Sequence, residues 1–332
     1  MTANSDRVIV TGGAGYIGTA VVASLLAAGR HVTVLDNLSL GADALLAFRQ
    51  FEGFRLERAD VSTDDLDGSV AGASAVVHLA ALVGYPACNR AGRQKTWDVN
   101  VTGTERVYEA ARRTGVERIV FASSYSNYGR VDGDRPVTEE SPLQPQSTYA
   151  ESKVEAEHFL LRQSGGPAPV CLRLATVFGL SPRTRFDLMV NQFVLDAYTT
   201  GRLVLYQEDF KRSFVHVDDV SHAIATVIDV PVDRVRGQVF NVGSESLNTT
   251  KAHLVELVRA RWPALEVETR ALDFAGDMRS IHVSYEKIRR VLGFATRYTL
   301  EDGIAELCWA LEHGVISDPA SARYRNHPAI VV

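Results

Sequence analysis

The sequence has 332 residues and contains few cysteines. The three that it has, Cys88, Cys171 and Cys308, lie far apart, and no two have the spacing of metal ligands or of a redox pair. This excludes a disulfide framework and a cysteine-rich metal centre, and we predict no metal site. We expect all three thiols to be reduced and to pack as small hydrophobic side chains in the core.

An excess of positive charge and long apolar runs are also missing. The formal net charge is −5 and the sequence pI is about 6.0, whereas a nucleic-acid partner would require a basic surface. No apolar stretch approaches the length of a membrane span. The first apolar run, Val8–Val10, is only as long as a strand and is followed at once by glycines, which is unlike a signal peptide. We therefore expect a cytoplasmic protein that binds neither nucleic acid nor membrane.

The first half of the chain alternates between two kinds of pattern. Short runs rich in β-branched residues predict strands, and longer runs with helical spacing separate most of them. Strands that alternate with helices indicate a parallel sheet, and right-handed crossovers give a doubly wound, Rossmann-type α/β fold. The predicted strands are 7–11, 31–36, 54–60, 74–80, 118–124 and 170–177, and the predicted helices are 16–29, 95–115 and 149–163.

The rhythm changes after about residue 178. We predict a dinucleotide-binding domain over 1–178, to which segments at about 214–243 return, and a smaller substrate-binding lobe from 179–213 and 244–332. Within the returning segment, "FVHVDDVSHAIATVIDV" predicts a helix capped by Asp218 or Asp219. The tail from about Ser317 onward is expected to be loosely attached.

Glycines at positions 12, 15 and 18 directly follow the first strand and open a helix. Gly12 suits a tight turn, Gly15 allows backbone to approach a pyrophosphate, and Gly18 allows close helix packing. The second strand ends in Asp36, which can accept hydrogen bonds from a ribose and would repel a 2′-phosphate, so the pattern predicts NAD rather than NADP. The alternative is a tight turn with a coincidental Asp. The predicted cofactor-binding residues are Gly12, Gly15, Tyr16, Ile17, Gly18, Asp36, Asn37, Asp60, Val61, Leu79, Ala80, Ala81, Asn100, Tyr149, Lys153 and Thr176.

A second motif lies in "STYAESK", where Tyr149 precedes Lys153 by one helical turn. A nearby ammonium favours the phenolate form of a tyrosine, so Tyr149 is a candidate general base toward a sugar or alcohol hydroxyl. The preceding strand ends in serines, of which Ser124 is placed to hydrogen-bond the reacting oxygen. Either motif alone could be a chance helix pattern or a polar turn, but a dinucleotide fingerprint precedes both. The predicted catalytic residues are therefore Ser124, Tyr149 and Lys153.

In this order, "TGGAGYIG", "HLAALVG", "SSYSNYG" and "YAESK" resemble the extended short-chain dehydrogenase/reductases, the NAD-dependent nucleotide-sugar epimerase and dehydratase family. The resemblance covers nearly the whole chain. It implies that Ser124, Tyr149 and Lys153 form a triad, that Arg212 and Arg279 bind the diphosphate of the substrate, and that Asn100 helps to fix the catalytic helix. It also implies a homodimer formed through helices near 95–113 and 149–163.

Two departures from the family patterns bear on the reaction. Where the 4,6-dehydratases carry an Asp-Glu pair, this chain has Tyr125 and Ser126, so we disfavour dehydration. Thr176 and Asp187 stand where the 4-epimerases often carry asparagines, and Asp187 would need an arginine partner beside a diphosphate. The predicted substrate-binding residues are Val83, Gly84, Ser124, Ser126, Thr176, Arg183, Arg185, Leu188, Arg212 and Arg279; for Arg183 and Arg185 a solvated surface position is an equal alternative.

The resulting hypothesis is an NAD-dependent nucleotide-sugar 4-epimerase that oxidises carbon 4 transiently to a 4-keto sugar and reduces it from the other face. The segments "AALVGYPACNR", "RLATVFGLSPRTRFDLMVN" and "RYTLEDGIAEL" resemble a subgroup that acts on nucleotide-activated heptoses. The alternatives are a 4-dehydrogenase or 4-ketoreductase on the same sugars and a non-catalytic NAD-sensing protein. The triad does not separate the first two alternatives from an epimerase, because all begin with the same hydride step.

Overall fold

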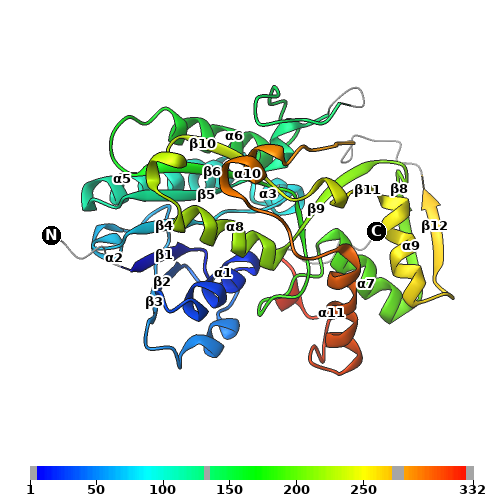
Figure 1. Cartoon of the computed structure of the whole chain (residues 1–332). Coiled ribbons are helices and arrows are strands. Elements are labelled where there is room, and N and C mark those ends of the chain that lie inside the picture. The colour runs from blue at the N-terminus through cyan, green and yellow to red at the C-terminus, as the bar shows by residue number, and fades with distance from the viewer. Residues whose placement is uncertain (1–5, 131–134, 271–279, 327–332) are drawn as a thin grey trace.

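The computed structural model describes residues 6–130, 135–270 and 280–326 of the chain. Within these residues, seven parallel strands form the main sheet in the order β10-β6-β5-β4-β1-β2-β3 (Figure 1). This confirms the predicted α/β fold with a doubly wound sheet. The strands are β1 Arg7–Thr11, β2 His31–Asp36, β3 Phe54–Arg58, β4 Ala75–His78, β5 Arg118–Ser124, β6 Ala168–Leu174 and β10 Gln238–Val242.

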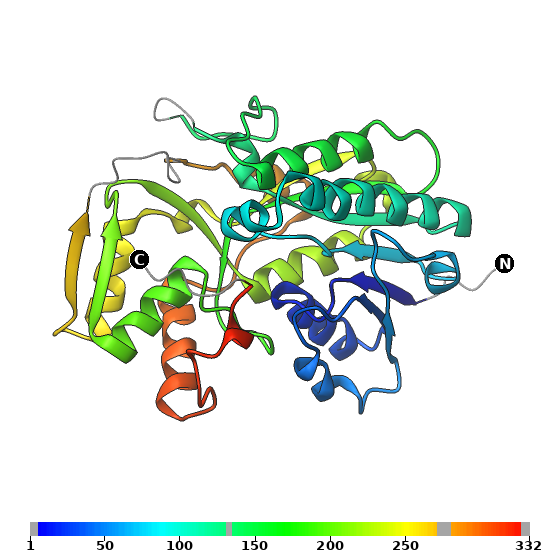
Figure 2. The same cartoon turned by 180° about the vertical axis from the view of Figure 1, so that it is seen from behind.

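Helices cover both faces of this sheet (Figures 1 and 2). Helices α1 (Tyr16–Ala27) and α8 (Val217–Asp229) share one buried cluster with Val8 and Val10 of β1. On the other face, α5 (Gly103–Thr114) and α6 (Thr148–Leu161) share a second cluster with Ile9. Because successive strand residues point to opposite faces, a strand that is apolar throughout fits only a sheet covered on both sides.

The helix predicted at 95–115 is divided into three parts. After α3 (Tyr85–Ala91), the chain forms α4 (Arg93–Trp97), a π-helical turn (Asp98–Thr102) and then α5. The wider turn contains Asn100, which is buried below both helices. Single π-turns inside helices are frequent at functional sites, and the contacts of Asn100 described below agree with that.

The strand predicted at 170–177 is also divided. The chain leaves the main sheet at Ala175, whose N–H donates to Val242 O at 3.1 Å, and the next three residues form β7 (Thr176–Phe178) of another sheet. The two pieces therefore lie in different layers, and β7 is the first strand of the smaller lobe.

The smaller lobe has its own hydrophobic core. Strands β7, β9 and β11 form one small sheet and β8 pairs with β12 in another (Figure 1). The lobe contains β8 Arg202–Tyr206, β9 Lys211–His216, β11 Asn248–Thr250, β12 Glu266–Arg270, α7 Met189–Thr200, α9 Lys251–Arg261 and α11 Leu300–Glu312.

Three details differ from the sequence prediction. The predicted cap of α8 is wrong: the capping side chain is His216, whose Nδ1 accepts from the N–H of Asp218, while Asp219 accepts from the backbone of a later segment. The segment around α10 (Glu286–Leu292), which we placed in the lobe, contributes Ile281 and other residues to the core of the main sheet. The tail is docked at least as far as residue 326, through contacts described below.

The three cysteines are buried, as predicted, and each is a free thiol. Burial raises the pKa of Cys308 to about 11 and that of Cys171 well above its ordinary value. Both thiols are therefore inert packing groups at neutral pH. Among the described residues, no helix has the length and apolar character needed to cross a membrane.

Candidate active site

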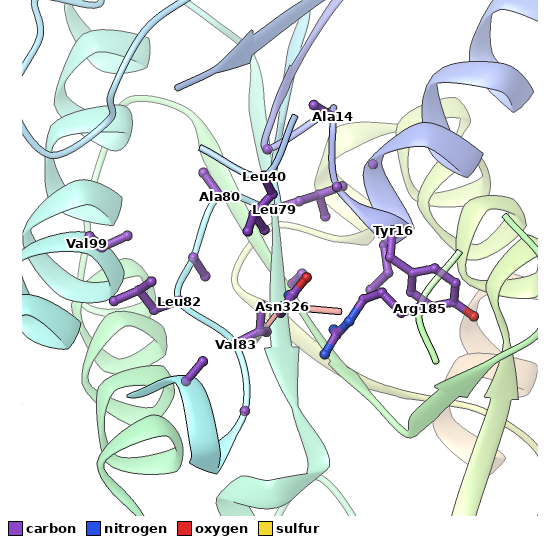
Figure 3. A pocket seen from close by; sticks show the side chains of 18 of the residues that line it. Ala14, Tyr16, Leu40, Leu79, Ala80, Leu82, Val83, Val99, Arg185 and Asn326 are labelled. Carbon is purple, nitrogen blue, oxygen red and sulfur yellow. The ribbon is translucent and has the colours of Figure 1, made fainter. Parts of the chain in front are cut away.

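One large cavity of about 550 Å³ opens between the main sheet and the smaller lobe (Figure 3). In this view Leu82 and Val83 lie on one side, Tyr16 and Arg185 on the other, and Asn326 between them. The structure brings most of the predicted site residues to this cavity: Gly12, Gly15, Tyr16, Ile17, Gly18, Asp36, Asn37, Asp60, Val61, Leu79, Ala80, Ala81, Val83, Gly84, Ser124, Ser126, Tyr149, Lys153, Thr176, Arg183, Arg185 and Leu188.

The glycine loop is built from close backbone contacts. Gly12 has φ of +69°, and a Cβ there would lie 2.7 Å from the backbone N of Ala80. A Cβ on Gly18 would lie 2.3 Å from Gly12 O, so this glycine lets the helix close onto the loop itself. Gly15 is the N-cap of α1 and has no side-chain cap, which leaves the first N–H groups of the helix facing the cavity.

Two carboxylates stand at the ends of β2 and β3, at one end of the cavity. The carboxylate of Asp36 accepts from the N–H groups of Ala14 at 3.1 Å and Leu38 at 2.8 Å. Burial raises its pKa, and these two hydrogen bonds partly offset the effect. Burial also acts on Asp60, but hydrogen bonds from Ser62 and Asn37 outweigh it and lower the pKa of Asp60. Both groups are fixed hydrogen-bond acceptors at neutral pH.

His78 lies at the end of β4 and belongs to the core. Its Nδ1 lies 2.7 Å from Thr11 Oγ1, and its Nε2 lies 3.0 Å from Thr104 Oγ1. Because Thr104 donates its own proton to Asn100 O, it must accept from His78, which assigns the Nε2–H tautomer. Burial and the nearby Lys153 lower the pKa of His78 to about 3, so the ring stays neutral.

The three predicted catalytic residues come from two adjacent elements. Ser124 ends β5; its Oγ accepts from Ser126 N at 3.1 Å and donates to Ser126 Oγ at 2.9 Å. Ser147 caps α6 and so starts the helix just before Tyr149. One turn later Lys153 is 3% exposed, and its Nζ donates to Ala122 O at 2.8 Å. Burial lowers the pKa of Lys153 to about 8.

Helix α6 is tied to its neighbours by buried polar contacts. Glu157, two turns after Tyr149, is fully buried, pairs with Arg173 of β6 at 2.5 Å and accepts from Ser123 Oγ at 2.6 Å. Asn100 donates to Ser152 Oγ at 2.9 Å and exchanges two hydrogen bonds with the backbone of Leu82. Breaking such buried networks is costly, so they hold α6 rigidly over the sheet.

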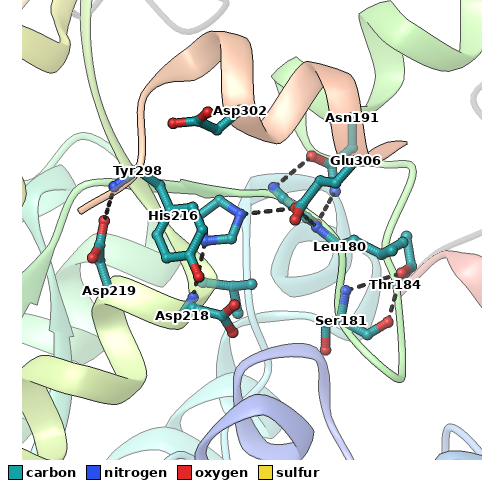
Figure 4. Close-up of polar contacts among 12 residues, drawn as sticks. Leu180, Ser181, Thr184, Asn191, His216, Asp218, Asp219, Tyr298, Asp302 and Glu306 are labelled. Atoms are coloured by element: carbon teal, nitrogen blue, oxygen red, sulfur yellow. Dashed lines mark hydrogen bonds and ion pairs between the residues drawn. The ribbon is translucent and has the colours of Figure 1, made fainter. Parts of the chain in front are cut away.

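The opposite wall is the loop 179–187, which side chains of α7 and α11 anchor (Figure 4). Asn191 of α7 exchanges two hydrogen bonds with Gly179. Glu306 of α11 accepts from the N–H of Leu180 and also lies 2.8 Å from His216 Nε2. Since Nδ1 of His216 accepts from the backbone, its Nε2 carries the proton and donates to Glu306.

This anchored loop carries two arginines that differ in their partners. Arg185 makes a two-fold ion pair with Asp187, with both N–O distances at 2.9 Å, which supplies the partner that Asp187 was predicted to need. Arg183 is only 7% exposed, and its Nε and Nη1 have no hydrogen-bond partner among the described residues. Burial and the neighbouring Arg185 lower the pKa of Arg183 to about 10, so it remains a cation.

Comparison with known proteins identifies the family. The sequence profile of the NAD dependent epimerase/dehydratase family matches residues 8–243, which is more than half of the chain. The chain belongs to the NAD-dependent epimerase/dehydratase family. It is 32% identical over 309 residues to a UDP-glucose 4-epimerase of Mycolicibacterium smegmatis, a match that covers 90% of this chain and 96% of that protein.

Another relative of the same family is named for a different reaction. A dTDP-glucose 4,6-dehydratase of Streptomyces griseus is 32% identical over 328 residues, covering 93% of this chain and 95% of that protein. The solved structure of MoeE5 in complex with UDP-glucuronic acid and NAD superposes with a TM-score of 0.80 at 30% identity, covering 92% of this chain and 99% of that one. Overall similarity therefore gives the family and fold but does not separate epimerase from dehydratase.

The cofactor of this family is NAD, and the cavity fits it. Gly12, Gly15 and Gly18 line the cavity beside the N-terminus of α1, whose first N–H groups have no side-chain cap, and this arrangement suits a diphosphate. Asp36 and Asp60 present acceptors at the end where ribose hydroxyls and adenine would lie, and Asp36 disfavours a 2′-phosphate.

Two predicted site residues, Asn100 and Arg212, are not among the described residues that line the cavity. Asn100 lies behind the wall, where it joins the loop after β4 to α6. Arg212 is 1% exposed on β9, and its Nη1 donates to Lys211 O at 3.1 Å. Arg279 lies outside the described residues. The role of each of the three remains a prediction.

Some lining residues were not predicted. Lys95 of α4 faces the cavity near Asp60, and its position four residues before Val99, another lining residue, follows the helical repeat. Leu40 belongs to the loop that follows Asp36, and its nearness to Asp36 and Asn37 in the sequence could have marked it as a cofactor contact. Asn326 reaches the cavity from the far end of the chain, and no motif in the sequence marks it.

Proposed function

We propose that this protein is an NAD-dependent nucleotide-sugar 4-epimerase, acting through transient oxidation at carbon 4 and re-reduction from the other face. The observation that supports it best is the chemistry of the cavity wall. Ser124, Tyr149 and Lys153 line it, whereas Asp36 and Asp60 are the carboxylates among the described lining residues, and both lie at the end assigned to adenosine. A site in which a tyrosine is the general base and no carboxylic acid lies nearby suits reversible oxidation of an alcohol.

The roles of the residues follow from their contacts. Tyr149 takes the proton from the 4-hydroxyl and later returns it. Ser124, whose Oγ is already held by Ser126, hydrogen-bonds the same sugar oxygen. Lys153 places a buried positive charge near Tyr149, and this charge favours loss of the phenolic proton. When bound, NAD supplies the reversible hydride acceptor.

Loss of water from carbon 6 would require a further positioned acid and base. Tyr125 and Ser126 occupy the places where the dehydratases carry their acidic pair. Tyr125 is 4% exposed, and its hydroxyl lies 2.8 Å from Thr176 Oγ1. This part of the cavity offers hydroxyl groups only, which argues against 4,6-dehydration despite the 32% identity to a dehydratase.

The substrate is proposed to be a nucleoside-diphosphate sugar bound against the smaller lobe. Arg183 and Arg185 offer planar cations on that wall, and bidentate donors suit phosphate oxygens. Arg212 and Arg279 are proposed as further diphosphate ligands, and Val83, Gly84, Thr176 and Leu188 as contacts to the sugar. An NDP-heptose remains the proposed sugar, by resemblance of sequence.

The proposal is tested by incubating the protein with a panel of UDP-glucose, UDP-glucuronic acid, dTDP-glucose and nucleotide-activated heptoses, followed by NMR of the product sugar. Inversion at carbon 4 without added cofactor is the expected result. Stoichiometric release of NADH would make the protein a 4-dehydrogenase, and turnover only with added NADH a ketoreductase. Binding of NAD with no turnover of any sugar would favour a sensing protein.

We further propose a cytoplasmic homodimer that pairs through the helical segment 93–114 and α6. Sedimentation at micromolar concentration tests the dimer, which predicts a single species of twice the chain mass of 36.3 kDa. A monomer under these conditions would exclude the pairing without affecting the proposed chemistry.

A further inference from the structure

The segment 321–326 at the end of the described chain is docked on the arginine-bearing wall. It forms a single 3₁₀ turn, Ala322–Tyr324, capped by Ser321. The carbonyl of Tyr324 accepts from Phe186 N at 2.8 Å, and the two rings meet edge to face at 5.8 Å. Arg325 Nη1 donates to Gln192 Oε1 of α7 at 3.0 Å. The tail is therefore held by specific contacts, contrary to the loose attachment expected from the sequence.

The docking joins the tail to the ion pair that faces the cavity. The N–H of Asn326 donates to Asp187 Oδ2 at 3.1 Å, and the same oxygen accepts from Arg185 Nη2 at 2.9 Å. Arg183 Nη2 lies 3.4 Å from the carbonyl oxygen of Arg325. The loop and the tail thus form one unit, and the position of residue 326 is fixed through its backbone.

This unit leaves polar atoms without partners at the cavity. Asn326 lines the cavity, and its Oδ1 is buried with no hydrogen-bond partner in the described chain. On the same wall, Arg183 Nε and Nη1 are also buried and have no hydrogen-bond partner in the described chain. A buried polar atom of this kind destabilises the protein unless a partner is supplied. An acceptor and two donors on one wall of the cavity match a ligand that offers both a hydroxyl and an anionic or carbonyl oxygen.

We propose that Asn326 is a specificity-determining residue whose side-chain oxygen accepts a hydrogen bond from a hydroxyl of the bound sugar, and that the docked segment Tyr324–Asn326 positions it. This inference rests on the proposed function, because it takes the ligand to be a nucleotide sugar.

The contacts that hold the docked segment favour the sugar over the dinucleotide as the ligand of Asn326. Phe186, Asp187 and Gln192, which hold the segment, all belong to the smaller lobe and not to the glycine loop. Figure 3 shows Asn326 between Val83 on one side and Arg185 on the other. Both residues are proposed substrate contacts, so Asn326 lies where substrate would pass between the two walls.

The test compares Asn326→Ala and Asn326→Leu with the wild type by calorimetric titration of UDP-glucose, UDP-glucuronic acid, dTDP-glucose, nucleotide-activated heptoses, the parent nucleotides and NAD. Both variants keep the backbone N–H that docks the tail, so they are expected to fold. Loss of one hydrogen bond to an uncharged hydroxyl should weaken binding of the nucleotide sugars about tenfold. Binding of UDP, dTDP and NAD should change less than about twofold. Arg323→Ala is the matched control, because that exposed side chain faces Asp43 at 3.6 Å and not the cavity.

The outcomes separate this inference from the proposed function. Wild-type affinity for the nucleotide sugars in both variants would overturn the role of Asn326. Equal losses for a nucleotide sugar and its parent nucleotide, or a loss for NAD, would overturn the assignment to the sugar. In all these cases the proposed function stands. If the wild type itself binds no nucleotide sugar, the proposed function fails and the inference falls with it.

Discussion

The two walls of the cavity are built in different ways. The wall on the main sheet consists of strand ends and helix starts that follow one another in the chain, and its shape depends on glycines where backbone meets backbone. The wall on the smaller lobe joins a loop after β7 to a segment more than a hundred residues later, and side-chain hydrogen bonds hold it. The first wall carries chemistry shared across a family, and the second is free to differ between substrates.

The largest effect is expected at the catalytic wall from Tyr149→Phe. Removal of the proposed proton acceptor should lower turnover by about 10²- to 10⁴-fold while the protein still binds NAD. Product formation by NMR and titration with NAD measure the two quantities. Tyr198→Phe, whose ring is 41% exposed on α7, is the control and should behave as wild type. Full activity of Tyr149→Phe would exclude the proposed base.

Gly12→Ala tests how strictly the glycine wall is built. The new Cβ would combine a positive φ with a backbone contact of 2.7 Å. We therefore expect the free energy of unfolding to fall by at least about 3 kcal/mol and the binding of NAD to be lost as well. Gly115→Ala is the matched control, because φ is +77° but nothing lies within 4 Å of the new Cβ. It should cost about 1 kcal/mol. Denaturant unfolding of both variants checks this, and equal losses would contradict the role of the contact.

Asp187→Asn breaks the wall on the smaller lobe. The carboxylate is 2% exposed and binds both Arg185 and the tail, so its neutralisation should cost about 3 kcal/mol and weaken binding of nucleotide sugars more than of NAD. Asp43→Asn, in an exposed ion pair, should cost less than about 0.5 kcal/mol. If Asp187→Asn lost affinity for NAD and for nucleotide sugars equally, the two walls would not act separately in binding.

The smallest effect on stability is expected from the buried charge of Lys153. Its pKa in the folded protein is about 8, below the ordinary 10.5, so the unfolded chain binds more protons between these values. Stability of the NAD-free protein should therefore rise with pH across this window. Lys153→Met should remove that rise and gain roughly 1–3 kcal/mol at pH 7 while abolishing turnover. Lys287→Met, at a half-buried position on α10, serves as control. If stability still rose with pH in Lys153→Met, the rise would belong to another group.

Local patterns in the sequence predicted the main wall well. Gly12, Gly15 and Gly18 lie within seven consecutive residues, and Tyr149 and Lys153 lie within one turn of α6, so short-range geometry is enough to place them. The end of β5 placed Ser124 in the same way. The division of the helix at 95–115 was missed, because a π-turn is selected by the buried contacts of Asn100 and not by local propensity.

The wall on the smaller lobe could be predicted only in part. Arg183 and Arg185 were candidates because of their charge, but the sequence did not show which of them is paired. The answer depends on Asp187 and on the tail, and such long-range contacts leave no periodic signal. His216 as the cap of α8 was missed for the same reason, because its orientation is set by Glu306 on a distant helix.

The docked segment also bears on the order in which the protein becomes functional during translation. Asn326 follows Tyr149 by 177 residues in the chain, so it leaves the ribosome well after the glycine loop and Tyr149. A nascent chain therefore completes its catalytic residues well before it completes the opposite wall. Because that wall requires Asn326, the proposed binding of nucleotide sugars would be acquired later in translation than the binding of NAD.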